Sequence, residues 1–163
     1  MRLSRVEQIG ILDLNVRALT DLTLRFLPEI VAARGGVLNL ASTASFQPGP
    51  GMAVYYASKA YVLSFSEALA WELRGRVRVT ALCPGPTPTG FQDRAHGMRE
   101  SRLRLVPTLT AEQVAEQGWR GFERGRRIVI PGLLNKIGAV LAPRQPRALT
   151  LALSAWLTGG GQA

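Results

Sequence analysis

Helical periods alternate with short apolar runs along this chain, and that alternation restricts the fold more than any other feature of the sequence. Residues 11–33 and 53–73 place apolar side chains at helical spacing, and each segment is followed by a glycine that can end a helix. A capping-box pattern beginning at Thr110 predicts a third helix, which reaches Arg120 or beyond. Three short apolar runs, typical of buried parallel strands, follow these helices in turn: residues 37–41, 77–83 and 128–130.

The order helix, strand, helix, strand, helix, strand predicts an α/β fold with a parallel sheet and helices on both of its faces. Two further apolar segments, residues 133–141 and 148–157, finish the chain, and residues 87–109 are predicted to form a loop. Parallel sheets usually have both faces and both edges protected. A sheet of only three strands, in a chain that begins at a helix, therefore indicates part of a larger three-layer fold.

Composition limits the class of protein. The 163 residues are predicted to form one domain, 1–163, and an apolar content of 47% is enough for a core. No run of about 18 or more apolar residues exists, so we expect no membrane span, and we expect no secretory signal either. The single cysteine, Cys83, excludes an internal disulfide and fits a cytoplasmic protein.

The net charge of +9 raises the question of a nucleic-acid partner. Among the 20 basic residues only Lys59 and Lys136 are lysines, and such a bias often reflects a GC-rich genome. No motif that reads DNA or RNA accompanies the charge, so we expect no nucleic-acid partner. The positive field would still attract anions, including a dinucleotide.

Tyr55 and Lys59 form the pattern most closely connected to chemistry. Their spacing of four puts both side chains on one face of the predicted helix. A tyrosine that acts as acid or base at neutral pH needs its pKa lowered by roughly three units, about 4 kcal/mol. A cation at about 4 Å, in an effective dielectric of about 20, supplies roughly that energy. We therefore expect Lys59 to lower the pKa of Tyr55; the alternative is a tyrosine packed over a lysine stem on a helix surface.

Two polar residues precede this pair at spacings that suggest a common site. Ser42 ends the first predicted strand, 13 residues before Tyr55, and open α/β sheets bind ligands at the carboxyl ends of their strands. Asn15 lies on the first helix, 27 residues before Ser42, where its amide can hold a water or a backbone group. The alternatives are a serine that merely ends a strand and an asparagine that faces solvent. Three neighbouring hydroxyls compete for the same roles: Tyr56, Thr43 and Ser45.

In combination these residues resemble the short-chain dehydrogenase/reductase family. The resemblance extends over roughly residues 11–132, and the spacings of 27 and 13 are those of the family's Asn-Ser-Tyr-Lys tetrad. The matching segments are Asp13-Leu14-Asn15-Val16, Gly36 to Ser42, Tyr55-x-x-x-Lys59, and Pro84-Gly85-Pro86-Thr87-Pro88-Thr89. The resemblance implies a partial Rossmann-like three-layer fold, whose parallel sheet corresponds to the last three strands of the family's sheet.

The resemblance also implies an oxidoreductase that transfers a hydride between NAD(P)(H) and a carbonyl or alcohol substrate. Tyr55 would be the general acid/base, Lys59 would lower its pKa and hold the nicotinamide ribose, and Ser42 would stabilise the substrate oxygen. Asn15 would support a water relay to Lys59. Cofactor contacts would come from Tyr55 and Lys59 and from the segment after the second strand: Pro84, Gly85, Thr87 and Thr89.

The family's glycine-rich phosphate-binding turn is absent from this sequence, and so is the residue that selects NAD or NADP. The outer edge of the strand at residues 37–41 is therefore expected to be exposed. We expect an amino-terminal truncation. The alternatives are a natural inactive fragment or pseudoenzyme that acts as a dimerisation or interaction module, and a chain that binds a partner for its missing half.

Three further expectations concern partners and ligands. The resemblance implies a homo-oligomer, because the family's two long helices commonly pair across a dimer axis, here at residues 11–33 and 53–73. His96 has no partner at metal-ligand spacing, so no metal is expected, and Cys83 is expected to be a buried structural thiol. Apolar residues in the predicted loop favour a lipophilic carbonyl or alcohol: Phe91, Met98, Leu103, Leu105 and Val106.

Overall fold

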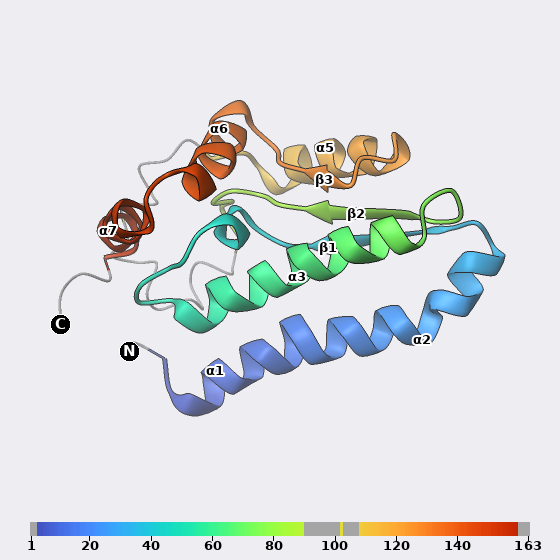
Figure 1. The fold of residues 1–163 in the computed structure, drawn as a ribbon, viewed down its shortest axis with the longest axis horizontal. Coiled ribbons are helices and arrows are strands. Elements are labelled where there is room, and N and C mark those ends of the chain that lie inside the picture. The colour runs from blue at the N-terminus through green and yellow to red at the C-terminus, as the bar shows by residue number, and fades with distance from the viewer. Residues whose placement is uncertain (1–2, 90–101, 103–107, 160–163) are drawn as a thin grey trace.

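A three-stranded parallel sheet forms the centre of the computed structural model, which describes residues 3–89, 102 and 108–159 (Figure 1). The strands lie side by side in the order β1 (Gly36–Leu40), β2 (Arg78–Leu82) and β3 (Ile128–Val129). The α-helices labelled in Figure 1 are α1 (Arg5–Leu12), α2 (Leu19–Ala32), α3 (Ala53–Glu72), α5 (Ala111–Glu123), α6 (Leu133–Leu141) and α7 (Arg147–Thr158). The predicted α/β fold with a parallel sheet is confirmed.

Helices cover both faces of the sheet, which gives the expected three layers (Figure 1). On one face, Leu69 of α3 packs with Val79 of β2 in a buried cluster that α2 also contacts. On the other face, Val114 of α5 packs against Leu82 of β2. Successive strand residues point to opposite faces, so β2 supplies a core to both layers.

The first helical region begins earlier than predicted and contains a π-helical turn. Helix α1 begins at Arg5 because Ser4 and Glu7 form a capping box, in which each side chain accepts the other residue's backbone N–H. That Ser-x-x-Glu pattern is visible in the sequence and is the signal that places the helix start correctly. The π-helical segment η1 (Asp13–Ala18) joins α1 to α2 and carries Asn15. Such turns are frequent at functional sites.

The capping box predicted at Thr110 is present. The hydroxyl of Thr110 accepts the backbone N–H of Gln113 at 3.3 Å, and the Gln113 side chain accepts the backbone N–H of Thr110 at 3.0 Å. Most of the loop predicted just before this point, residues 90–101 and 103–107, lies outside the described residues.

Strand β1 lies at an edge of the sheet. It pairs with β2 in the register that places Val37 opposite Val79, and among the described residues no strand pairs with its outer side. The side chains of Leu38 and Leu40 are 37% and 54% exposed. The expected exposure of this edge is therefore observed.

Helix α5 approaches the sheet closely because glycines face the strands. A Cβ atom at Gly118 would lie 2.6 Å from Cδ2 of Leu82, and one at Gly121 would lie 2.3 Å from Cγ2 of Val129. Both distances are far shorter than a van der Waals contact. Gly10 in α1 is different, because a Cβ atom there would have no heavy atom within 4 Å.

Gly121→Ala is therefore expected to lower the free energy of unfolding by about 1–3 kcal/mol, because the added methyl group overpacks the interface between α5 and β3. Gly10→Ala is the matched control and should raise it by up to about 1 kcal/mol, since alanine is the better helix former. Urea denaturation followed by circular dichroism measures both changes. An unchanged midpoint for Gly121→Ala would contradict the close packing.

Candidate active site

A cavity of about 550 Å³ lies at the carboxyl ends of β1 and β2. Ser42 follows β1 and Pro84 follows β2, whereas Tyr55 and Lys59 enter the cavity from α3. All eight residues that the sequence singled out line this cavity: Asn15, Ser42, Tyr55, Lys59, Pro84, Gly85, Thr87 and Thr89. The fold thus brings separate segments of the chain to one place, where open α/β sheets bind their ligands.

The side chains of Tyr55 and Ser42 meet in the cavity. Burial raises the pKa of Tyr55 above its usual value, and a hydrogen bond with the Ser42 side chain acts in the opposite direction. Ser42 is itself held in place by the start of a short 3₁₀ helix, η2 (Thr43–Phe46), where its hydroxyl accepts the backbone N–H of Ala44 at 3.1 Å. Two hydroxyls that contact each other in this way can both reach one oxygen atom of a small ligand.

The expectation that Lys59 lowers the pKa of Tyr55 does not hold in this structure, where the pKa is raised. The Lys59 Nζ atom donates to the backbone oxygen of Leu40 at 2.8 Å and lies 6.0 Å from the centre of the Tyr55 ring. Burial also lowers the pKa of Lys59. The two residues do share a helix face as predicted, but the ammonium group is held by the end of β1. Desolvation therefore decides the pKa of the tyrosine in this structure.

Asn15 contacts α3 through a serine that the sequence did not single out. Its Nδ2 atom donates to the hydroxyl of Ser58 at 3.0 Å, and that hydroxyl donates to the backbone oxygen of Tyr55 at 2.7 Å. Ser58 is 1% exposed. These bonds attach the π-helical turn to the helix that carries Tyr55 and Lys59. The sequence signal that could have identified Ser58 is its position directly before Lys59 in the Tyr55-x-x-x-Lys59 motif.

The competing hydroxyls have different surroundings. Tyr56 is buried, which raises its pKa to about 12, and its ring lies so close to Gly49 that a Cβ atom there would be 2.2 Å away. The hydroxyl of Ser45 donates to the backbone oxygen of Lys59 at 2.7 Å. These contacts indicate that the Tyr56 ring packs in the core and that Ser45 positions the backbone of α3 at Lys59. Thr43 lines the cavity and stays an alternative to Ser42.

The segment after β2 forms the opposite wall of the cavity. The hydroxyl of Thr87 donates to the backbone oxygen of Gly85 at 3.1 Å. A Cβ atom at Gly85 would lie 2.3 Å from Oδ1 of Asn135, so glycine is what allows α6 to approach this segment. The Asn135 side chain donates to the backbone oxygen of Pro131 at 2.8 Å. The close approach of Gly85 and Asn135 could not be predicted from sequence patterns, because these two residues are far apart in the chain.

The remaining predicted residues are structural or lie outside the described part. Cys83 is fully buried, and burial raises the pKa of its thiol to about 12, which agrees with a structural role. His96 and the five apolar loop residues fall outside the described residues. Within the described residues, no cluster of three or more His, Cys, Asp or Glu side chains could hold a metal ion. No described helix is both long and apolar enough to span a membrane.

A sequence profile described as "short chain dehydrogenase" matches residues 2–100, which is more than half of the chain. The chain belongs to the short-chain dehydrogenase family. A sulfoacetaldehyde reductase of Chromohalobacter salexigens is 39% identical over 115 residues, covering 65% of this chain and 45% of that protein. A serine 3-dehydrogenase of Agrobacterium fabrum is 36% identical over 108 residues, covering 63% and 43%. The matched part of the chain thus spans somewhat less than half the length of each of these two relatives.

Solved structures of short-chain dehydrogenases have the same fold. One from Sphingobium yanoikuyae, in complex with NADPH, is similar with a TM-score of 0.73 and 29% identity, covering 88% of this chain and 57% of that one. Another, from Burkholderia phymatum in complex with NAD, has a TM-score of 0.76 at 22% identity, covering 87% and 59%. At 22% identity, the similarity to the Burkholderia phymatum structure shows a shared fold alone.

Proposed function

We propose that this chain provides the catalytic part of an oxidoreductase that transfers a hydride between NAD or NADP and a carbonyl or alcohol substrate. The observation that carries this proposal is the contact between Tyr55 and Ser42 inside a cavity that Lys59 also lines. A phenol and a second hydroxyl directed at one point suit the protonation and binding of a carbonyl oxygen. Membership of the family and the NADPH bound to the similar short-chain dehydrogenase from Sphingobium yanoikuyae support the same function.

The residues fit the nicotinamide end of such a cofactor, which when bound would supply or accept the hydride. Lys59 is half-buried at the cavity wall. Its Nζ atom donates to the Leu40 oxygen, and an ammonium group has three donors, which leaves donor capacity for a ribose hydroxyl. Gly85 brings backbone to the cavity without a side chain, and Thr87 and Thr89 line the same wall. These features suit either NAD or NADP, because they lie at the end that the two share.

Proton transfer is assigned to Tyr55. In the reducing direction its hydroxyl donates a proton to the carbonyl oxygen, while the Ser42 hydroxyl donates a hydrogen bond to the same atom. In the oxidising direction the Tyr55 oxygen takes the proton back. Since burial raises the pKa of Tyr55, the tyrosine needs a cation beside its phenol to act as a base near neutral pH. Lys59 would supply that cation by turning from the Leu40 oxygen toward the phenol, and a bound oxidised cofactor would add positive charge. The turnover of Tyr55→Phe tests this assignment.

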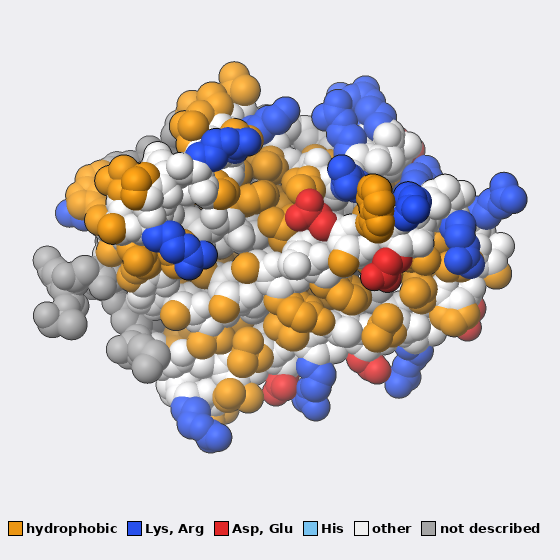
Figure 2. Space-filling model, viewed as in Figure 1, with side chains coloured by type: hydrophobic (Ala, Val, Ile, Leu, Met, Phe, Trp, Pro, Cys, Tyr) orange, Lys and Arg blue, Asp and Glu red, His pale blue; other side chains and the backbone are white. Residues whose placement is uncertain are grey.

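The second candidate function is a dimerisation module, favoured by the exposed apolar surface of the long helices. Figure 2 shows hydrophobic side chains spread over the side of the molecule formed by α1, α2 and α3. Leu22 and Phe26 of α2 are 52% and 53% exposed and lie one helical turn apart, and Trp71 of α3 is 60% exposed. An apolar surface of this kind on a soluble domain commonly marks a protein interface.

We therefore predict that the protein is a homo-oligomer that associates through these helices. Replacing Leu22 and Phe26 together with aspartate should convert it to a monomer, because two charges would be buried at the interface. Leu149 and Leu153 of α7 are similarly exposed and similarly spaced, so their replacement with aspartate is the control and should leave the mass unchanged. Analytical ultracentrifugation at high micromolar concentration gives the mass. A monomeric starting protein would exclude this interface.

A further inference from the structure

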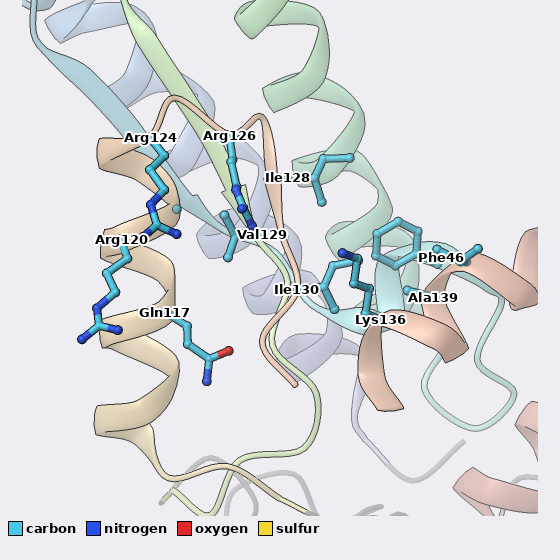
Figure 3. Close-up of a pocket in the computed structure, with 12 residues that line it drawn as sticks. Phe46, Gln117, Arg120, Arg124, Arg126, Ile128, Val129, Ile130, Lys136 and Ala139 are labelled. Atoms are coloured by element: carbon cyan, nitrogen blue, oxygen red, sulfur yellow. The ribbon is translucent and has the colours of Figure 1, made fainter. Parts of the chain in front are cut away.

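A second cavity, of about 460 Å³, lies away from the active site, along the outer edge of β3 (Figure 3). Helix α5 forms one side and α6 the other, and the β3 segment forms the floor. Among the residues that the structure describes, none lines both this cavity and the candidate active site. We call it the edge cavity; twelve residues line it: Phe46, Gln117, Arg120, Gly121, Arg124, Arg126, Ile128, Val129, Ile130, Lys136, Ala139 and Val140.

Four of these residues are cations and none is acidic. Arg120 forms an ion pair with Glu116 on α5. No ion pair within the described residues involves Arg124, Arg126 or Lys136. Figure 3 shows Arg124 at the end of α5, Arg126 in the turn that follows it, and Lys136 on α6 beside Phe46. Their charges are therefore available to a ligand.

The backbone that carries two of the arginines is tightly held. Helix α5 ends in a turn in which Gly125 has a φ of +65°, a conformation that suits glycine. The backbone N–H of Arg126 donates to the oxygen of Gly121 at 3.0 Å, and the hydroxyl of Thr80 in β2 donates to the oxygen of Arg126 at 2.7 Å. The turn thus presents Arg124 and Arg126 on either side of a glycine at the mouth of the cavity.

Interaction with a helix dipole could explain why a cation lies at Arg124, but it does not explain the cation at Lys136. Arg124 at the carboxyl end of α5 complements the negative end of that helix dipole. Lys136 does not fit that explanation, because it lies in the first turn of α6, where the dipole favours negative charge. An anion bound in this cavity would compensate the charge of Lys136, which the dipole of α6 does not.

The shape and lining of the edge cavity restrict the ligand. Strand β3 has only two residues and is followed by Ile130 and Pro131, so it offers little edge for pairing with a peptide strand. A second copy related by a two-fold axis would bring like charges together. The side chains of Phe46 and Val140 add apolar surface beside the cations. We propose that the edge cavity binds a small amphipathic anion, with a phosphate or carboxylate group at the arginines and an apolar body on Phe46 and Val140.

Isothermal titration of the 163-residue chain with hexyl phosphate, inorganic phosphate and hexanol tests this proposal. Hexyl phosphate should bind at least about tenfold more tightly than either of the others, because only it engages both the cations and the apolar wall. The double substitution Arg124→Gln, Arg126→Gln should weaken its binding at least about tenfold. The control Arg17→Gln, Arg25→Gln removes the same charge from the exposed side of the first helices and should leave the affinity unchanged.

Two additional variants separate the possible outcomes. Lys136→Gln should weaken hexyl phosphate binding on its own, and it replaces the double variant if circular dichroism shows that the latter does not fold. Lys59→Gln should have no effect; a loss of binding in that variant would place the phosphate in the active site and overturn the proposal. Absence of saturable binding at millimolar hexyl phosphate, or equal losses in the Arg124, Arg126 variant and its control, would overturn it as well.

Discussion

The 163-residue chain alone is expected to bind NADH and NADPH at least about a hundredfold more weakly than the same chain preceded by the glycine-rich amino-terminal segment of a family relative. The cavity offers Lys59, Gly85, Thr87 and Thr89 to the nicotinamide end, but the sequence contains no glycine-rich turn for the pyrophosphate. A loss of about 3 kcal/mol of contacts corresponds to that hundredfold change, since each 1.4 kcal/mol is a factor of ten.

Fluorescence titration of both cofactors against both proteins measures this difference. A suitable extension is the part of the Chromohalobacter salexigens sulfoacetaldehyde reductase that precedes its match to this chain, because that protein is 39% identical over the 115 matched residues. The exposed outer edge of β1 favours aggregation, so light scattering must accompany each titration. Micromolar binding by the folded, monodisperse 163-residue chain would contradict the prediction and would mean that the chain builds a dinucleotide site from other residues.

In the extended protein, Tyr55→Phe is expected to lower turnover by about 10²–10⁴-fold, the usual contribution of a positioned acid/base group. The substitution removes only the hydroxyl that contacts Ser42 and keeps the ring that packs at the cavity wall. Cofactor affinity should therefore stay within about twofold, since the ring contacts are kept. The readouts are the steady-state rate of NAD(P)H consumption with a panel of lipophilic ketones and aldehydes, and the cofactor titration described above.

Tyr56→Phe is the matched control for this substitution. Tyr56 is adjacent, buried and also lines the cavity, so its variant reports any general effect of removing a phenol hydroxyl from this helix. Turnover of Tyr56→Phe should remain within a few-fold of that of the parent protein. A large loss in Tyr56→Phe together with a small one in Tyr55→Phe would reverse the assignment. If both variants lose only a small and equal part of the turnover, neither tyrosine is the acid/base group.

Local patterns in the sequence determined most of the secondary structure. The capping box at Thr110 and the helical period over residues 53–73 both correspond to observed elements, α5 and α3. Such patterns succeed because capping and periodicity depend on residues that are three or four positions apart. The predicted start of the first helix is wrong by six residues, because a capping box formed by Ser4 and Glu7 begins the helix at Arg5. The π-helical turn carries no comparable signature.

The convergence of Ser42 with Tyr55 could also be predicted, because carboxyl ends of parallel strands meet at one edge of a sheet and the spacing matched a known family. The hydrogen-bond partners of the residues in the candidate site could not be predicted in this way. Lys59 binds the Leu40 oxygen, and Asn15 contacts Ser58, 43 residues further along the chain. Hydrogen-bond partners of this kind, and the burial that raises the pKa of Tyr55, depend on how α3 packs against β1 and η1. The residues that line the candidate site could thus be named from sequence patterns. Their hydrogen-bond partners and the direction of the pKa shift of Tyr55 depend on the tertiary structure, because desolvation and charge contacts arise between segments distant in the chain.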